Sequence, residues 1–235
     1  MTSPTPLLVF DLDGTLADTA GDLIATLNVV LAREGIAPLP LEEARPMLGT
    51  GARALISRGM AAAGRTVSGA RLEQLFADFL DHYQNHIADH SRLFPGVEDA
   101  LERFAGAGYG FAVCTNKYEA PSVRLLEILG VADKFRAICG QDTFPMCKPD
   151  PRALLLTIGK AQGDPSRCVM FGDSRTDIDT AKAARIPVVA VDFGYTDTPV
   201  ALLGPDVVIS HYAEAFDAVA GLLGRNRLDL ARSTS

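Results

Sequence analysis

Six short apolar runs, separated by segments with helical spacing, most strongly constrain how this chain can fold. The first run is Leu7–Phe10, and the others are GFAVCT, FRAICG, CVMFGD, PVVAVD and DVVIS. Each run is apolar throughout rather than alternately apolar and polar, which indicates strands buried on both faces. Such strands, alternating with helices, form a parallel sheet covered by helices. The sequence therefore predicts a doubly wound α/β core.

A long segment without strand signals, 18–93, follows the first run. Its apolar residues recur every three or four positions, which predicts helices. The clearest positions are Leu23, Leu27, Val30 and Leu31, and then Leu72, Phe76, Phe79, Tyr83 and Ile87. We expect 18–93 to be an all-helical cap inserted into a catalytic core formed by 1–17 and 94–225. The polar end of the chain, 226–235, is expected to be a flexible tail.

Composition narrows the classes of partner. The 235 residues are 48% hydrophobic and carry a formal net charge of −7. This charge argues against nucleic acid or an anionic membrane as the main partner, because phosphate groups bind clustered Lys and Arg. No stretch reaches the roughly 18 apolar residues of a membrane span, and no signal-peptide pattern is present, which predicts a cytoplasmic location. The cysteines are interpreted as reduced structural thiols; they are Cys114, Cys139, Cys147 and Cys168.

Polar side chains follow several of the predicted strands. In chain order they are Asp11, Asp13 and Gly14, then Thr115, Asn116 and Lys117, then Lys148 in a loop, and then Asp173, Ser174 and Asp177. Any one group has a simpler interpretation: two acids before a glycine can start a turn, a threonine can cap a helix, and a loop lysine can be solvated. Ligands of such sheets bind beyond the carboxyl ends of the strands. We expect these groups to converge there.

This set of side chains suits one kind of chemistry. Several carboxylates close together repel one another without a cation, and hard carboxylate and carbonyl oxygens favour Mg²⁺. The hydroxyl, amide and ammonium groups can bind an oxyanion. A site of this composition can catalyse phosphoryl transfer by positioning and charge neutralisation.

The motifs DLDGTLADT, Thr115, Lys148 and GDSRTD stand in the order and setting of the four motifs of the haloacid dehalogenase superfamily, which the chain resembles over nearly its whole length. The runs GDSRTDIDTAKAARIPVV and FGYTDTP resemble its phosphoglycolate phosphatase branch, although Thr176 stands where an Asn is common. The resemblance implies a Mg²⁺-dependent phosphate monoester hydrolase that works through an aspartyl-phosphate. Its implied substrate is 2-phosphoglycolate or a similar small phosphorylated acid.

The resemblance also implies a role for each site residue. Asp11 would be the nucleophile, and Asp13 would protonate the leaving alkoxide and then activate water. Mg²⁺ would be held by the Asp11 and Asp173 carboxylates and by the backbone carbonyl of Asp13. The remaining phosphate-binding and supporting groups would be Gly14, Thr115, the amide of Asn116, Lys148, Ser174 and Asp177, the last orienting Lys148 or a metal-bound water.

Two other activities of the superfamily are disfavoured. A dehalogenase expels halide and needs no acid such as Asp13. A phosphonatase, by resemblance, needs a lysine in its cap, and no lysine lies between Thr2 and Tyr109. Four alternatives stay open: a phosphatase of sugar phosphates, a phosphatase of nucleoside monophosphates, a sugar phosphomutase, and a catalytically silent phosphate-binding module.

The predicted cap contributes two further candidates. In the run LGTGARALI, Gly49 and Gly51 are expected to form a loop before a helix that carries Arg53. The resemblance implies that this loop recognises the leaving group. An Arg there is suited to bind a carboxylate or a second phosphate. The alternative for Arg53 is an exposed helix charge. His82, His86 and His90 are spaced as a zinc or pH-sensing site on one helix face would require; a solvated or inter-helix face is the simpler interpretation. A monomer and a homodimer are both compatible with the sequence.

Overall fold

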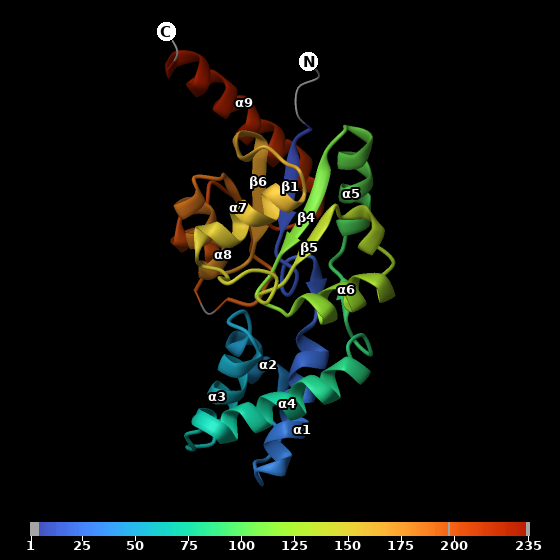
Figure 1. Ribbon diagram of the computed structural model, residues 1–235, viewed down its shortest axis with the longest axis vertical. Coiled ribbons are helices and arrows are strands. Elements are labelled where there is room, and N and C mark those ends of the chain that lie inside the picture. The colour runs from blue at the N-terminus through green and yellow to red at the C-terminus, as the bar shows by residue number, and fades with distance from the viewer. Residues whose placement is uncertain (1–4, 197, 234–235) are drawn as a thin grey trace.

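A six-stranded parallel sheet forms the centre of the computed structural model, which describes residues 5–196 and 198–233 (Figure 1). The strands lie in the order β5-β4-β1-β6-β7-β8. Their bounds are β1 Leu7–Phe10, β4 Gly110–Cys114, β5 Ala137–Cys139, β6 Cys168–Gly172, β7 Val188–Val191 and β8 Val207–Ile209. β1 lies in the middle, with Leu7 opposite Gly110 on one side and Cys168 on the other. The predicted doubly wound α/β core is confirmed.

Helices cover both faces of the sheet. One face packs against α5 (Val97–Gly106), α6 (Glu119–Ile128) and α9 (Ala215–Ser233), and the other packs against α7 (Pro151–Lys160) and α8 (Arg175–Ala184). Successive residues of each strand enter opposite cores, because side chains of a strand alternate between its faces. In β1, Leu8 and Phe10 join the first core, and Leu7 and Val9 join the second. This two-sided burial explains why the runs are apolar throughout.

Four α-helices that follow the first strand lie beyond the carboxyl edge of the sheet (Figure 1). They are α1 (Ala20–Arg33), α2 (Leu41–Ala44), α3 (Ala52–Ala62) and α4 (Gly69–Asn85). The chain passes into and out of this helical cap through a two-stranded antiparallel ribbon of β2 (Ala17–Asp18) and β3 (Arg92–Leu93). The sequence analysis missed the ribbon, because two residues per strand are too few for a periodic signal.

The ends of α4 and α9 bear on two expectations from the sequence analysis. α4 ends at Asn85, so the three histidines do not share one helix face: the His82 and His86 rings stack with centroids 4.4 Å apart, and His90 lies beyond the helix. The backbone of α9 extends to Ser233, and residues 234–235 lie outside the described residues. Flexibility of 226–235 therefore stays a prediction. The four cysteines are free, as expected.

Candidate active site

The carboxyl ends of β1, β4 and β6 bring the predicted acids and donors to one place. Asp11 and Asp13 follow β1, Thr115 follows β4, and Asp173 follows β6. Lys148 arrives from the loop before α7, whose start is fixed by Pro151 and by the Asp150 side chain, which accepts the Arg152 amide. The expected convergence of the strand ends is present in the structure.

Lys148 is buried between two carboxylates. Its ammonium lies 2.9 Å from Asp11 Oδ1 and 2.6 Å from Asp177 Oδ1, and its side chain is 2% exposed. The other oxygen of Asp177 accepts hydrogen bonds from the Ser174 amide and hydroxyl at the start of α8. Helix capping thus fixes Asp177, and Asp177 in turn positions the Lys148 ammonium against Asp11.

Both carboxylate oxygens of Asp173 accept hydrogen bonds from other segments of the core. Its Oδ2 accepts the backbone amide of Tyr195 at 2.6 Å, and its Oδ1 accepts the Thr15 hydroxyl at 3.2 Å. Two glycines leave it room: a Cβ on Gly14 would lie 2.3 Å from Asp173 Oδ2, and a Cβ on Gly194 would lie 2.2 Å from Asp173 Cβ. Gly14 also needs its positive φ of 83° for the turn after β1.

Replacing Gly194 by alanine is expected to displace Asp173. The new methyl group would overlap the aspartate, and overpacking of this kind costs about 1–3 kcal/mol. We expect a lower melting temperature and a higher Mg²⁺ concentration for half-maximal stabilisation, both measured by thermal denaturation. Gly106→Ala at the end of α5 is the matched control, since nothing lies within 4 Å of its added Cβ. Equal behaviour of the two variants would contradict the prediction.

The buried acids form a cluster that fits a cation. Ligand oxygens of Asp11, Asp173 and Asp177 lie within 4.8 Å of one another. Asp11 Oδ1 is buried and, although Lys148 is close, has no partner with hydrogen-bond geometry. Burial raises the pKa of Asp11 to about 6, opposed by Lys148 and reinforced by Asp177. Burial, and then Asp177 and Asp11, raise the pKa of Asp173. A divalent cation beside these oxygens would relieve the repulsion.

Asp13 faces a different set of partners. Its Oδ1 accepts the Thr19 hydroxyl at 2.8 Å, and its two oxygens lie 3.0 and 3.1 Å from Lys117 Nζ. Lys117 also donates to Tyr83 Oη of the cap helix α4 at 2.8 Å. Burial opposes the charge of Lys117, but Asp13 and Tyr83 more than offset it and raise the pKa of that ammonium. Asp13 therefore has its own cation, Lys117, whereas Lys148 serves Asp11 and Asp177.

The predicted phosphate-binding residues lie beside Asp11. Thr115 is buried, and its hydroxyl accepts the Lys117 amide, whereas α6 is capped at Tyr118; Thr115 is not the helix cap. The side-chain amide of Asn116 donates to the Lys148 carbonyl, which ties the two segments together. The Gly14 amide is bonded to the Ala17 carbonyl within its turn. Phosphate binding by these groups stays a prediction.

A cavity between the sheet edge and the cap opens onto these groups. Its floor includes Asp11, Asp13, Thr115, Asn116 and Lys117, and its cap wall is mainly apolar, formed by Leu23, Leu48, Leu55, Phe79, Leu80 and Tyr83. Gly49, Gly51 and Ala52 of the predicted cap loop also line it.

Arg53 lies outward from this lining. Its guanidinium makes two hydrogen bonds of 2.9 and 2.8 Å to Glu73 and one of 3.1 Å to Tyr118 Oη. The side chains of Arg53 and Glu73 are 40% and 57% exposed. The guanidinium also lies 3.6 Å from the centre of the Phe76 ring. A substrate-binding role for Arg53 stays a prediction.

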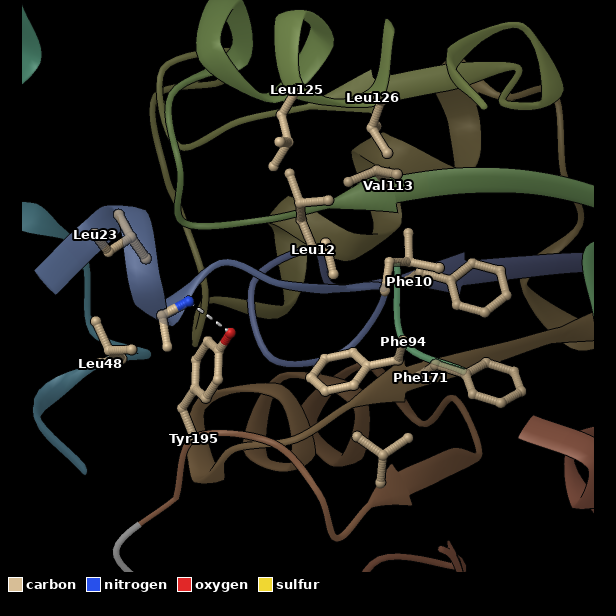
Figure 2. Packing of buried hydrophobic residues seen from close by; sticks show 14 of the residues in the cluster. Phe10, Leu12, Leu23, Leu48, Phe94, Val113, Leu125, Leu126, Phe171 and Tyr195 are labelled. Atoms are coloured by element: carbon tan, nitrogen blue, oxygen red, sulfur yellow. Dashed lines mark hydrogen bonds between the residues drawn. The ribbon is translucent and has the colours of Figure 1, made fainter. Parts of the chain in front are cut away.

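Tyr195 links the acid cluster to the start of the cap and was not singled out from the sequence. Its hydroxyl accepts the amides of Thr19 and Ala20 and donates to Asp18 at 2.6 Å; Figure 2 shows the ring reaching the start of α1. Thr19 is the N-cap residue of α1, but its hydroxyl donates to Asp13 and does not cap the helix. The Tyr195 hydroxyl accepts the first amides of α1 instead. The run FGYTDTP, which contains Tyr195, supported the family resemblance, but it did not predict a role for this tyrosine. The hydrogen bond to Thr19 joins residues 176 positions apart, and no local pattern predicts such a contact.

The fold and the site together define a helix-capped α/β protein with a buried carboxylate cluster at the carboxyl edge of its sheet. The chain belongs to the haloacid dehalogenase-like hydrolases, whose family model matches residues 8–191. It is therefore a hydrolase with the predicted resemblance confirmed. The described helices include none that is both long and apolar enough to span a membrane.

Relatives with phosphatase names align over most of the chain. A phosphoglycolate phosphatase of Mesorhizobium japonicum is 53% identical over 207 residues, covering 88% of this chain and 91% of the relative. An N-acetylmuramic acid 6-phosphate phosphatase of Pseudomonas aeruginosa is 35% identical and covers 90% of this chain and 93% of the relative. A crystal structure described as a predicted phosphoglycolate phosphatase from Haemophilus somnus has a TM-score of 0.84 and 27% identity, covering 92% and 99% of the two chains. The enzyme is a phosphatase of this family.

Proposed function

We propose that this enzyme is a Mg²⁺-dependent phosphate monoesterase that acts through an aspartyl-phosphate, with 2-phosphoglycolate as its leading substrate. The observation that carries the proposal is the arrangement around Asp11. The buried Lys148 ammonium lies 2.9 Å from its carboxylate, and oxygens of Asp173 and Asp177 lie within 4.8 Å of it. Asp13 follows two positions later, held by the Thr19 hydroxyl and the Lys117 ammonium. The name of the relative from Mesorhizobium japonicum supports the choice of substrate.

The proposed reaction has two steps. An Asp11 carboxylate oxygen attacks phosphorus, while the bond from phosphorus to the ester oxygen breaks and Asp13 donates a proton to that oxygen. Water then attacks the aspartyl-phosphate, Asp13 takes a proton from it, and the bond between phosphorus and Asp11 breaks to regenerate the carboxylate. Proton transfer by a positioned carboxyl group contributes roughly 10²- to 10⁴-fold to the rate.

Other residues bind and neutralise the phosphoryl group. Lys148 offsets charge on Asp11 and on phosphate oxygens, and the Thr115 hydroxyl and the Asn116 backbone amide donate to those oxygens. A divalent cation would be held by Asp11 and Asp173 with the Asp13 carbonyl, and would supply charge neutralisation and alignment of the phosphate. Asp177 and Ser174 keep Lys148 in place.

Binding of Mg²⁺ is expected to depend on pH, because protons compete with the cation for Asp11. With a pKa of about 6, Asp11 is mostly ionised at pH 7.5 and mostly protonated at pH 5. The apparent affinity for Mg²⁺ should therefore be at least roughly tenfold weaker at pH 5. Titrating the melting temperature with MgCl₂ at both pH values measures this, and Asp173→Asn should lose most of the response. Equal affinity at the two pH values would contradict the prediction.

A phosphorylated sugar acid is the second candidate substrate, favoured by the name of the relative from Pseudomonas aeruginosa. Phosphate release from a panel separates the candidates. The panel contains 2-phosphoglycolate, N-acetylmuramic acid 6-phosphate, β-glucose 1-phosphate and nucleoside monophosphates, each with and without Mg²⁺. We expect Mg²⁺-dependent release with the highest kcat/KM for 2-phosphoglycolate. A higher kcat/KM for another ester would make that ester the proposed substrate in place of 2-phosphoglycolate. Absence of phosphate release from every ester would favour the mutase or the silent phosphate-binding module.

The cap is proposed to open and close about the ribbon of Ala17–Asp18 and Arg92–Leu93, admitting substrate and then excluding water. Hydrogen exchange at β2 and β3 should slow when Mg²⁺ and a phosphate analogue are added, and unchanged exchange there would argue against hinge motion. A cytoplasmic location and a monomeric or homodimeric state remain predictions.

A further inference from the structure

The cation in the cavity lining is Lys117, a residue that the proposed two-step reaction leaves without a role. Among the described residues that line the cavity, no other Lys or Arg occurs. The side chain of Lys117 is 7% exposed, and its ammonium lies between Asp13 of the core and Tyr83 of the cap. In the proposed reaction Asp13 protonates the ester oxygen, so a buried cation bound to Asp13 would face the part of the substrate that departs with this oxygen.

Tyr83 offers a hydrogen-bond donor at the same place. Its side chain is 2% exposed, and its hydroxyl oxygen accepts a hydrogen bond from Lys117 Nζ at 2.8 Å. Within the described residues the hydroxyl proton has no acceptor, so it is free to donate. Lys117 also lies over the Tyr83 ring, 4.4 Å from the ring centre, which holds the two side chains together. An oxyanion beside this pair would accept a neutral hydrogen bond from Tyr83 and, in place of one Asp13 oxygen, a charged hydrogen bond from Lys117.

We propose that Lys117 and Tyr83 bind a carboxylate on the leaving group and thereby select esters whose acid group lies one carbon from the ester oxygen. This assignment rests on the proposed function and deepens it. Lys117 contacts both oxygens of Asp13, so a carboxylate one carbon beyond the ester oxygen is within its reach. A longer or neutral alcohol places no charge there. Asn or Gln could not replace the ammonium, since neither carries the positive charge of a charge-assisted hydrogen bond to a carboxylate.

Arg53 is the rival for this role, because it carries the required charge in the first turn of α3, directly after the cap loop that lines the cavity. Its guanidinium already makes two hydrogen bonds to Glu73, and it lies outside the described lining of the cavity. Two bonds of this kind use the fork geometry that a substrate carboxylate would need. Lys117 and Tyr83, in contrast, line the cavity directly.

The test compares two esters that differ in the acid group alone. These are 2-phosphoglycolate and 2-hydroxyethyl phosphate, in which a CH₂OH group replaces the carboxylate. The ratio of their kcat/KM values is the acid preference. We expect Lys117→Met to lower the acid preference by roughly 10- to 100-fold and Tyr83→Phe to lower it by roughly 3- to 10-fold, as loss of a charged and a neutral hydrogen bond predicts. Lys117→Arg should restore part of the preference lost in Lys117→Met.

Tyr83→Phe keeps the buried ring and Lys117, so the test does not depend on Lys117→Met folding. Calorimetric binding of both esters to Asp11→Asn, with and without Tyr83→Phe, gives the same comparison without turnover. An equal loss of kcat/KM for both esters in the variants would mean that Lys117 only positions Asp13, and it would overturn the assignment. A loss of acid preference in Arg53→Gln without such a loss in Lys117→Met would overturn it as well. A wild-type enzyme without acid preference would overturn the proposed substrate together with the assignment. A strong wild-type preference retained in both variants overturns the assignment alone.

Discussion

Replacing Asp11 by asparagine is expected to lower kcat for phosphate release by at least about 10⁴-fold, in the range found when a covalent nucleophile is removed. The amide cannot form the bond to phosphorus, and it removes one ligand from the carboxylate cluster. The substitution is nearly isosteric. It removes a negative charge that burial and the nearby Asp177 carboxylate disfavour. The fold should therefore be retained, with a melting temperature at or above that of the wild type when Mg²⁺ is absent.

The measurement is single-turnover and steady-state phosphate release with saturating Mg²⁺, beside the melting temperature. Asp99→Asn makes the same chemical change on the exposed surface of α5 and serves as the matched control. Activity within tenfold of the wild type in a folded Asp11→Asn enzyme would rule out Asp11 as the nucleophile. A reduced activity with a collapsed melting temperature would instead assign Asp11 to stability.

Replacing Lys148 by methionine is expected to abolish turnover and also to destabilise the fold. Methionine fills a similar volume but leaves Asp11 and Asp177 buried without their cation, and breaking a buried pair in this way costs about 3–5 kcal/mol. The loss should appear as a lower urea midpoint with an unchanged slope. Lys160→Met is the control: this lysine is 47% exposed and lies 3.8 Å from Glu119, so its loss should change stability by less than about 1 kcal/mol.

The destabilisation of Lys148→Met should shrink as the pH falls. Lys148 lowers the pKa of Asp11 and Asp173, so its removal raises both further above the ordinary value of 3.8. Between that value and the raised pKa the folded state binds more protons than the unfolded state, and stability falls as pH rises. The deficit should therefore be largest near pH 7 and smaller near pH 4.5. A deficit that is constant with pH would mean that lost packing rather than charge is responsible.

The sheet and the acid cluster were predictable because their signals are local. Each buried strand is a run of apolar residues, and each acid stands immediately after one, so the parallel sheet alone brings Asp11 and Asp173 together. Phe10 of β1 pairs with Phe171 of β6, and their rings stack with centroids 4.7 Å apart, one residue before Asp11 and two residues before Asp173 (Figure 2). The strand pairing that brings the two acids to the same edge of the sheet is thus encoded in the runs that precede them.

Contacts between core and cap were not predictable from local patterns. Tyr83 was assigned to the apolar face of a helix, and it is indeed buried; its hydroxyl, however, meets Lys117, 34 positions away. Lys117 was placed at a strand end without a role, since nothing in the sequence tells which way its long side chain turns. Tyr195 likewise depends on the docking of α1. Periodicity predicts which face of a helix is buried, but not which polar atom of that face meets a partner.

The ribbon of β2 and β3 makes the cap a module. Because Ala17 pairs with Leu93, the two points where the cap joins the core are neighbours, and a short hairpin turn could close the chain between them. The residues proposed for the reaction steps, Asp11, Asp13, Thr115, Lys148 and Asp173, all lie outside the insertion. Variation within 18–93 can therefore change which alcohol is accepted while the bond-breaking machinery stays intact, so that substrate range and reaction type can diverge independently in evolution.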